Sequence, residues 1–134
     1  MDPQIIEQLV KTALAARSNA YAPYSKFLVG AAVRTSDGNI LSGANVENTS
    51  LGLTLCAERV AAVTAISAGH RQLTAVAVAT AGGVLPCGAC RQFLAEFGAD
   101  MHVILVDADQ SVQVANYLLG DLLPDPFERG KPED

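Results

Sequence analysis

Apolar residues recur at every third or fourth position in the first eighteen residues of the chain. They are Ile6, Leu9, Val10, Ala13 and Leu14. This spacing puts them on one face of an α-helix. The helix has a start signal, because Asp2 can cap it and Pro3 suits its first position. We therefore predict a helix that begins at Asp2-Pro3 and runs to about Ser18.

Strand-like segments follow a loop at residues 21–25. The first two, residues 27–35 and 39–44, are separated by Asp37-Gly38, a pair that favours a tight hairpin turn. Three further segments have the same character, and the first of them reads as a buried strand. They are residues 73–80, 102–106 and 111–115. The pattern thus predicts five strands.

Two helical segments lie between these strands. The alanine-rich segment 56–68 predicts a helix closed by Gly69, and its small residues suit close packing against a sheet. The segment 87–97 predicts a short helix stopped by Gly98. The stretches predicted to be loops, the last with one helical turn, are residues 45–54, 82–86 and 118–127.

Length and composition agree with one α/β domain that spans residues 1–134. A chain of 134 residues supports one hydrophobic core, and no repeat or linker divides it. Half of the residues are apolar and 17% are charged, which excludes a disordered chain. No apolar run approaches the roughly 18 residues that span a bilayer, and Met1-Asp2-Pro3 does not start a secretion signal. We expect a cytoplasmic protein.

The charge balance excludes several classes of partner. Nine Lys and Arg stand against fourteen Asp and Glu, a formal charge of −5, and the basic residues form no cluster. Such a surface repels phosphate backbones and anionic lipids. We expect no nucleic acid and no membrane as partner, and a small neutral ligand fits better.

The three cysteines, Cys56, Cys87 and Cys90, are the first candidates for chemistry. Cys87 and Cys90 are three residues apart in a predicted helix, so their sulfurs can reach one atom. A thioredoxin-like redox pair has the same spacing, although the chain has no tryptophan to flank it and a redox pair leaves Cys56 unexplained. Three unrelated buried cysteines are the plainest alternative.

A zinc site explains all three cysteines together. Cys56 and Cys87 begin predicted helices, whose N-termini stabilise thiolates. Three thiolates suit Zn²⁺, and three protein ligands with an open fourth position are typical of catalytic zinc. Water at that position becomes acidic. His70 and His102 have no ligand-like spacing to the cysteines.

Glu58 and Arg59 take roles beside such a site. Near a helix N-terminus, Glu58 can reach the water without binding zinc, and can move protons between water and a leaving group. Arg59 lies three residues after Cys56, where a guanidinium offsets the excess negative charge of three thiolates on Zn²⁺. Taken alone, both residues would fit a solvated first helical turn.

With these residues the chain resembles the cytidine deaminase family, in its small homotetrameric three-cysteine class. The motifs that carry the resemblance follow one another in family order over nearly the whole chain. They are Tyr21-Ala-Pro-Tyr-Ser-Lys-Phe27, Gly43-Ala-Asn-Val-Glu-Asn48, Cys56-Ala-Glu-Arg59, Pro86-Cys-Gly-Ala-Cys-Arg-Gln92 and Leu122-Leu-Pro-Asp-Pro-Phe127.

The resemblance implies a fold and a reaction. The fold would be a three-layer sandwich around a five-stranded mixed sheet, assembled as a homotetramer. The reaction would be hydrolytic deamination of cytidine and deoxycytidine at C4, with one Zn²⁺ per chain on Cys56, Cys87 and Cys90. Glu58 would be the proton shuttle, the role of a glutamate outside the zinc ligands in nucleobase deaminases generally. By the same resemblance it would also contact N3 of the base.

The resemblance also implies a set of substrate contacts. The backbone around Ala57 would meet the base, and Phe27 would pack on its ring. Asn45 and Glu47 would bind the ribose hydroxyls, and Phe127 would reach the site of a neighbouring subunit.

Arg59 would hydrogen-bond the zinc-bound sulfurs. Plainer readings remain for the substrate contacts: Phe27 as a core residue, Asn45 as a turn residue, Glu47 as solvated and Phe127 as part of a loose terminus.

One position departs from the family pattern. Leu51 stands where the family usually has a tyrosine, near the sugar side of the pocket and the subunit contacts. This leaves open a related function, deamination of a modified cytosine nucleoside or of an antibiotic such as blasticidin S. A non-catalytic zinc module and a thiol redox protein are alternatives of another class. Polynucleotide editing is disfavoured by the charge and by the few aromatic residues.

Overall fold

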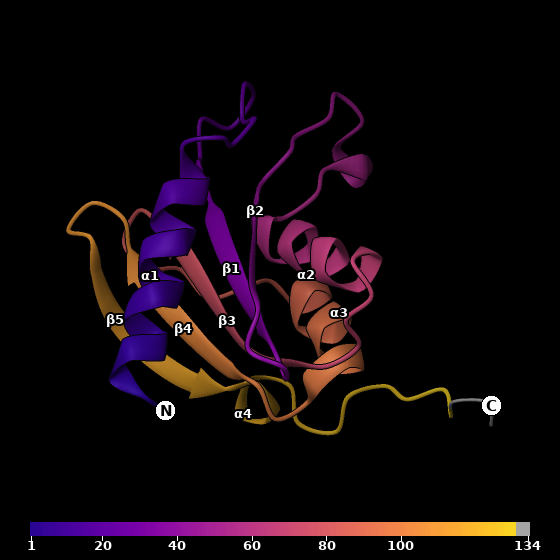
Figure 1. Ribbon diagram of the computed structural model, residues 1–134. Helices are drawn as coiled ribbons and strands as arrows, with labels where there is room; N and C mark the ends of the chain where they lie inside the picture. Colours follow the sequence, from indigo (N-terminus) through magenta and orange to yellow (C-terminus); the bar gives the residue numbers. More distant parts are fainter. Residues whose placement is uncertain (131–134) are drawn as a thin grey trace.

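The structure, a computed structural model, describes residues 1–130, so the end of the predicted domain range, residues 131–134, lies outside the described residues. One sheet stands between helices on its two faces (Figure 1). Its strands are β1 (Gly30–Thr35), β2 (Ile40–Ala44), β3 (Leu73–Thr80), β4 (His102–Asp107) and β5 (Val112–Leu118). The helices are α1 (Pro3–Arg17), η1 (Leu51–Leu53), α2 (Ala57–Ser67), α3 (Gly88–Gly98) and α4 (Leu119–Leu122).

The sheet has the strand order β2-β1-β3-β4-β5. β3 and β4 are parallel because α3 connects them by a crossover, and every other pair of neighbours is antiparallel. The predicted five-stranded mixed sheet is therefore confirmed. The parallel pair ends with Thr80 beside Asp107, and this end of the sheet faces the loops that precede α2 and α3.

Alternate residues of the strands point to opposite faces of the sheet and contribute to two separate hydrophobic cores. On one face, α1 packs over a layer built largely of alanine. On the other, α2 and α3 pack over a layer richer in valine and leucine. The residues that define the first core are Leu9, Ala13, Ala32, Ala75, Ala77, Ala79, Ile104 and Val106. Two helical layers around one sheet confirm the three-layer sandwich.

Two glycines let the helices approach the sheet closely. A Cβ on Gly43 of β2 would lie 2.4 Å from the backbone nitrogen of Ala61 in α2. A Cβ on Gly30 of β1 would lie 2.1 Å from the carbonyl oxygen of Ala13 in α1. Neither contact leaves room for a side chain, so these positions fix the spacing between sheet and helices.

The predicted helix starts and ends agree with the structure within one or two residues. Asp2 caps α1 by accepting a hydrogen bond from the backbone N–H of Gln4 (2.8 Å), and Pro3 is the first helical residue. Cys56 and Cys87 are the N-caps of α2 and α3. Gly69 follows the C-cap of α2 with φ +104°, a value that glycine adopts without strain.

The first predicted strand was too long at its start. β1 begins at Gly30, and residues 27–29 are not part of the sheet. The side chain of Asn45 holds this segment instead: its Nδ2 donates to the carbonyl oxygen of Phe27 (2.8 Å), and its Oδ1 accepts from the N–H of Val29 (2.9 Å). The side chain of Asn45 thus makes hydrogen bonds to this segment of the kind that a neighbouring strand makes within a sheet.

The predicted boundaries also differ at the last strand. Ser111 has φ +56° and belongs to the turn, so β5 starts at Val112. The strand extends past the predicted end at residue 115 to Leu118, which pairs with His102, and the helical turn expected within residues 118–127 is α4. The turn η1 within the predicted loop 45–54 was not foreseen.

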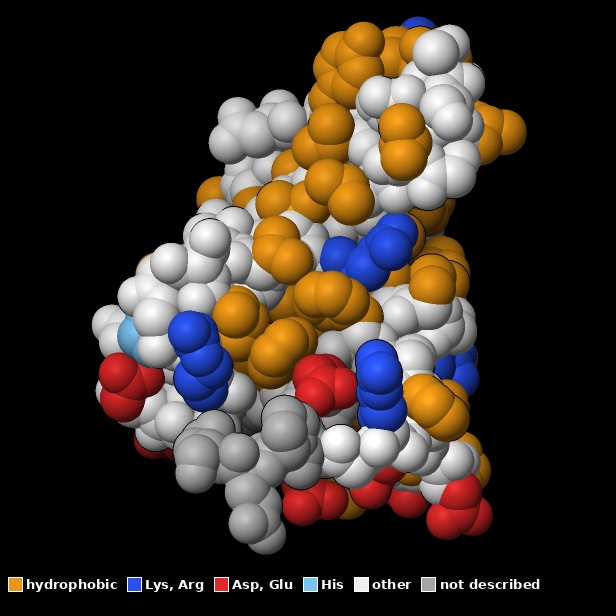
Figure 2. Space-filling view, turned by 90° about the vertical axis from the view of Figure 1, so that its right-hand side faces the viewer, with side chains coloured by type: hydrophobic (Ala, Val, Ile, Leu, Met, Phe, Trp, Pro, Cys, Tyr) orange, Lys and Arg blue, Asp and Glu red, His pale blue; other side chains and the backbone are white. Residues whose placement is uncertain are grey.

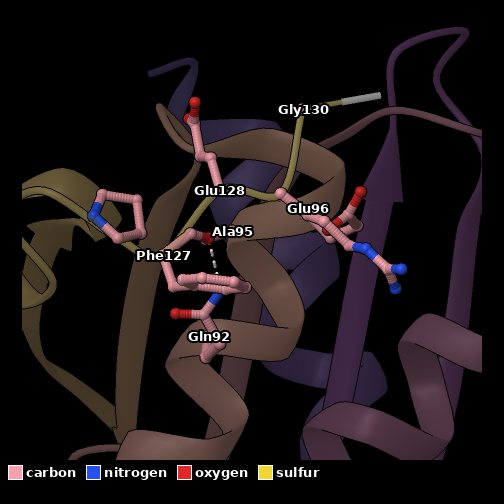
Figure 3. Close-up of a pocket in the computed structure, with 8 residues that line it drawn as sticks. Gln92, Ala95, Glu96, Phe127, Glu128 and Gly130 are labelled. Carbon is pink, nitrogen blue, oxygen red and sulfur yellow. Dashed lines mark hydrogen bonds between the residues drawn. The ribbon is translucent and has the colours of Figure 1, made fainter. Parts of the chain in front are cut away.

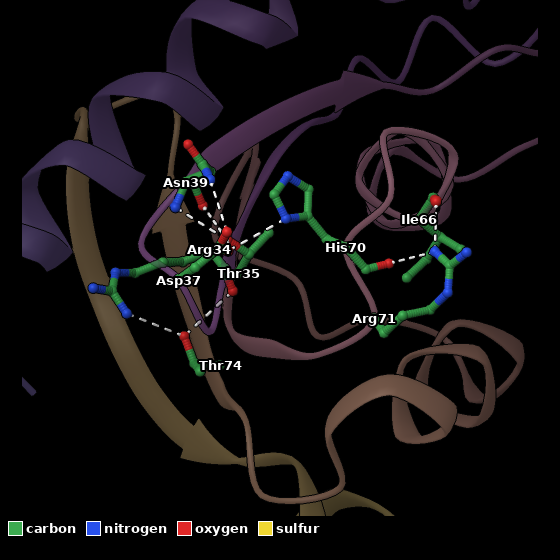
Figure 4. Close-up of polar contacts among 8 residues, drawn as sticks. All are labelled: Arg34, Thr35, Asp37, Asn39, Ile66, His70, Arg71 and Thr74. Atoms are coloured by element: carbon green, nitrogen blue, oxygen red, sulfur yellow. Dashed lines mark hydrogen bonds and ion pairs between the residues drawn. The ribbon is translucent and has the colours of Figure 1, made fainter.

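The hairpin predicted at Asp37-Gly38 is present, with Gly38 at φ +91°. Figure 4 shows its polar contacts, in which Asp37 accepts hydrogen bonds from Thr35 Oγ1 and Asn39 Nδ2. His70, in the loop after α2, lies with Nδ1 3.3 Å from Asp37 Oδ1. The hairpin is thus tied to the loop between α2 and β3.

Among residues 1–130, none of the helices has the length and apolar character needed to cross a membrane.

Candidate functional site

Three cysteine sulfurs gather at the N-terminal ends of α2 and α3. The Sγ atoms of Cys56, Cys87 and Cys90 all lie within 4.8 Å of one another, and those of Cys87 and Cys90 are 3.5 Å apart. The side chains of the N-cap residues Cys56 and Cys87 make no capping hydrogen bond. Both sulfurs are therefore available to a metal ion at the ends of two helices.

Two of the cysteines, Cys56 and Cys90, have pKa values shifted in opposite directions. The pKa of Cys56 is lowered to about 5, because Cys90 donates a hydrogen bond to its sulfur and the guanidinium of Arg59 lies beside it. The same hydrogen bond, together with burial, raises the pKa of Cys90. A metal ion bound to both sulfurs requires them as thiolates, so its binding would displace the proton of Cys90.

Arg59 contacts the cluster from α2. Its Nη2 donates to the carbonyl oxygen of Thr54 (3.1 Å) and to the sulfur of Cys56 (3.8 Å). Its Nε is, within residues 1–130, the single buried side-chain nitrogen or oxygen that lacks a hydrogen-bond partner. A half-buried guanidinium beside thiolates offsets their negative charge.

These residues fit a zinc ion. Two thiolates that share a tetrahedral zinc ion at Zn–S distances of about 2.3 Å lie about 3.8 Å apart, close to the separation of Cys87 and Cys90. A three-sulfur donor set is what soft metals prefer. Three ligands leave one tetrahedral position open for water, as in catalytic zinc sites.

Glu58 lies beside the cysteines without joining the sulfur cluster. It is the second residue of α2, and its side chain is 4% exposed. Burial, with the negative charge of Cys56, raises the pKa of Glu58. A buried carboxyl group that exchanges protons more readily near neutral pH is suited to acid–base chemistry.

A pocket of about 260 Å³ opens over Cys56, Ala57 and Glu58. Most of its lining side chains are apolar, and none is Lys or Arg. The complete lining is Ser25, Phe27, Val29, Asn45, Glu47, Thr54, Leu55, Cys56, Ala57, Glu58, Val78, Thr80, Val84 and Leu85. The pocket thus combines an apolar wall with two carboxylates, and it is large enough for a small ring compound.

Four of the five predicted substrate contacts line this pocket. Ala57 is the fully buried first residue of α2, and Phe27 is 41% exposed, so Phe27 is not a core residue. Asn45 is 7% exposed and retains capacity for further hydrogen bonds, since each of its side-chain polar atoms makes one.

Glu47 organises the loop at one side of the pocket. Its Oε1 accepts from the N–H groups of Tyr24 (3.0 Å) and Ser25 (3.1 Å), and its Oε2 accepts from the hydroxyl of Ser25. The hydrogen bond from the Ser25 hydroxyl is the main cause of the lowered pKa of Glu47. The carboxylate is therefore ionised, and can accept a further hydrogen bond.

Phe127 lies apart from this pocket. It is 75% exposed and lines a different cavity of about 200 Å³, between α3 and the segment 126–130 (Figure 3). The carbonyl oxygen of Phe127 accepts a hydrogen bond from Gln92 Nε2 (3.1 Å). The structure therefore does not bring Phe127 together with the other predicted site residues of the same chain.

The two histidines are also remote from the cysteines. His70 contacts Asp37 at the hairpin. His102 is the first residue of β4, and the pocket lies at the other end of that strand. Leu51, in η1, is 79% exposed and does not line the pocket of its own chain.

Several pocket residues were not predicted from the sequence. They are Ser25, Val29, Thr54, Leu55, Val78, Thr80, Val84 and Leu85. Ser25 lies inside the motif at residues 21–27, and the Gly82-Gly83 pair marks the loop that carries Val84 and Leu85. The remaining residues carry no chemical signal, since they are common in strands and loops.

Comparisons with known proteins agree with this geometry. The family model for the zinc-binding region of cytidine and deoxycytidylate deaminases matches residues 3–106. The cytidine deaminase of Halalkalibacterium halodurans is 47% identical over 124 residues, 90% of this chain and 92% of the relative. That of Mycobacterium tuberculosis is 46% identical over 114 residues, 84% and 81% of the two chains.

Solved structures show the same likeness. The crystal structure of cytidine deaminase from Burkholderia pseudomallei has a TM-score of 0.85 and 45% identity, and the match covers 95% of this chain and all of that one. The crystal structure of the enzyme from Mycobacterium tuberculosis has a TM-score of 0.79 and 40% identity, covering 92% and 98%.

Proposed function

Because the chain belongs to the cytidine and deoxycytidylate deaminase family, we propose that it is a zinc-dependent hydrolase of free nucleosides. It converts cytidine and deoxycytidine to uridine and deoxyuridine and releases ammonia. The observation that carries this proposal is the cluster of Cys56, Cys87 and Cys90 beside the buried Glu58, at the base of a pocket without basic residues. The unit that acts is a single domain, residues 1–134, with one zinc ion.

Cys56, Cys87 and Cys90 hold the zinc ion in this proposal. When bound, zinc supplies a coordinated water molecule with a pKa near neutrality. Glu58 would accept a proton from the attacking water molecule while the oxygen of that water forms the bond to C4 of the pyrimidine. Glu58 then gives a proton to the departing amino group as the C4–N bond breaks, and it also contacts N3 of the base. Arg59 hydrogen-bonds the sulfurs and limits their negative charge.

The remaining residues orient the nucleoside. Phe27 packs on the pyrimidine ring, and the backbone around Ala57 meets its polar edge. Asn45 and Glu47 bind the ribose hydroxyls through the hydrogen-bonding capacity that their contacts within the chain leave over. A neutral sugar suits this arrangement, because Glu47 is ionised.

We predict that the enzyme prefers nucleosides to nucleotides. The pocket holds Glu47 and Glu58 and no lining Lys or Arg, so a 5′-phosphate brought near them would be repelled and unpaired. We expect kcat/KM for CMP and dCMP to be at least about 100-fold lower than for cytidine and deoxycytidine, since an unpaired buried charge costs several kcal/mol.

The measurement is the loss of absorbance of the amino-pyrimidine, with zinc quantified in the same sample. Blasticidin S and a modified cytosine nucleoside complete the substrate panel and test the alternative substrate class. Comparable turnover of CMP and cytidine would contradict the role given to Glu47. No turnover of cytidine at millimolar concentration, with zinc bound, would contradict the proposed function as a whole.

We propose that four chains assemble around sites near their interfaces. Hydrophobic side chains gather on the face shown in Figure 2, which is the side of the molecule that carries α2 and α3. Leu51, Leu53 and Val63 are among the exposed apolar residues, with Leu51 79% and Leu53 66% exposed. Phe127, exposed and outside the pocket of its own chain, then reaches the site of a neighbour.

This assembly predicts a mass in solution of four chains of 13.9 kDa, measured by light scattering. Mixing tests the contribution of Phe127 across the interface. Chains with Glu58→Gln and chains with Phe127→Ala, each poorly active alone, should regain activity when dissociated and reassembled together, because mixed tetramers contain some intact sites. A monomeric mass, or mixing without gain, would contradict the arrangement.

We also propose a cytoplasmic location. The three cysteines are free thiols in close proximity, a state that a reducing compartment maintains.

A further inference from the structure

The loop between β3 and α3 forms a wall of the pocket that the proposed reaction does not use. Residues 81–86 connect Thr80, the last residue of β3, to the metal-site residue Cys87. Val84 and Leu85 line the pocket and are 50% and 39% exposed. A substrate that enters the pocket would cover their apolar side chains.

Two side chains at the ends of parallel strands hold this loop. The hydroxyl Oγ1 of Thr80 accepts a hydrogen bond from the N–H of Val84 (2.7 Å). Oδ1 of Asp107, the last residue of β4, accepts from the N–H of Gly82 (3.0 Å) and from that of Asp109 (3.0 Å). Thr80 and Asp107 are paired in register, so they meet the loop side by side.

Both residues are buried, and their oxygen atoms are used by the backbone of the loop. Thr80 is 3% exposed and Asp107 is 9% exposed. The carbonyl oxygen of Thr80 also accepts from the N–H of Ala108 (2.8 Å) and from that of Gly83 (3.3 Å). The acceptors of these two residues thus satisfy three consecutive N–H groups of the loop.

The loop needs such support because of its glycines. Gly82 and Gly83 have φ +79° and +73°, and Gly83 passes so close to β5 that a Cβ would lie 2.5 Å from Val114 Cγ2. Glycine permits this path but also permits many others. The hydrogen bonds to Thr80 and Asp107 hold the loop in one backbone conformation.

The metal-site end of the loop has a separate anchor. Arg91 Nε donates to the carbonyl oxygen of Pro86 (2.8 Å), and Arg91 Nη1 donates to that of Leu122 (2.9 Å). The N–H of Arg91 donates to the carbonyl oxygen of Cys87 (3.0 Å). Loosening residues 81–85 therefore leaves Cys87 in position.

From this arrangement we infer that Thr80 and Asp107 are positioning residues for substrate binding. They hold Val84 and Leu85 as a preformed wall, so the substrate does not have to order the loop when it binds. They act on affinity and leave the proton transfers and zinc unchanged. This inference rests on the proposed deaminase function.

The test separates KM from kcat in zinc-loaded enzyme. Thr80→Val and Asp107→Ala, which remove one acceptor each, should each raise KM for cytidine about tenfold, the effect of a lost hydrogen bond and a loosened wall. kcat should stay within about twofold of its value in the unaltered enzyme, and zinc should remain at one ion per chain. Thr80→Ser and Asp107→Asn keep the acceptor oxygen and should restore KM to within about twofold of the unaltered enzyme.

Matched controls remove similar contacts far from the pocket. Asp37→Ala loses the hydrogen bonds to Thr35 and Asn39, and Thr74→Val loses that to the carbonyl oxygen of Arg34. Both should lower the melting temperature and leave KM unchanged.

Three results would overturn the inference: an unchanged KM in Thr80→Val and Asp107→Ala, a fall in kcat at constant KM, or no rescue by Thr80→Ser and Asp107→Asn. Thr80→Val conserves volume, so it keeps the test valid even if Asp107→Ala does not fold. A failure of the proposed function shows itself differently, as absent turnover in the unaltered enzyme.

Discussion

Replacing Glu58 by glutamine is expected to leave zinc bound and to reduce kcat for cytidine by about 10²–10⁴-fold, the range typical for loss of a general acid–base group. Glutamine has the size and hydrogen-bonding capacity of glutamate but cannot carry the proton. Because Glu58 is 4% exposed and lies at the base of the pocket, solvent water cannot easily replace it. The sulfur cluster does not include Glu58, so the metal should be retained.

The measurement is steady-state turnover with zinc analysis on the same preparation. Glu7→Gln is a matched control, since Glu7 lies on the exposed side of α1 and pairs only with Lys11 among the ion pairs of residues 1–130. That variant should keep full activity, because an exposed ion pair on a helix surface contributes little to stability and Glu7 lies far from the cysteines. Normal turnover by Glu58→Gln would refute the role of proton shuttle.

Removal of Cys56 is expected to abolish activity by a different route. Cys56→Ala takes away one of three protein ligands, so zinc content should fall far below one per chain and cytidine turnover should become undetectable. The melting temperature should fall as well, because metal that binds only the folded chain stabilises it. The losses of activity and of melting temperature should match those of the unaltered protein treated with a chelator.

Thiol chemistry provides the readout for this variant. The chain has three cysteines, all in the cluster, so every thiol reports on the metal site. In the zinc-loaded protein the thiols should resist a thiol reagent, and chelation should expose all three. In Cys56→Ala the remaining two should react without chelator. Full zinc occupancy together with protected thiols in Cys56→Ala would contradict the assignment of ligands.

The parts of the fold that follow from the sequence are those with a local physical signal. The cap at Asp2-Pro3, the hairpin turn at Asp37-Gly38 and the glycine after α2 each act within a few residues, and each is present in the structure. The predicted boundaries were wrong where a residue distant in sequence determines the local structure. β1 starts late because Asn45, fifteen residues after Gly30, occupies the preceding backbone groups.

The site residues also differ in whether a local signal marks them. The position of Cys56 and Cys87 at helix N-termini was predicted from local pattern, and both residues are N-caps. The support of the pocket by Thr80 and Asp107 was not foreseen, because it depends on which strands lie side by side and on main-chain N–H groups that any sequence possesses. Phe127 lies apart from the pocket of its own chain, and the contact proposed for it, with the site of a neighbouring subunit, lies outside what a single chain can show.

The close approach at Gly43 also bears on which mutations this protein tolerates. A larger residue there cannot be absorbed by a change of rotamer, because the atom it meets is the backbone of Ala61. α2 would have to move as a rigid body, and Cys56 at its start would move with it, away from the two cysteines of α3. Sequence variation at a position outside the pocket is therefore limited by the geometry of metal binding as well as by packing.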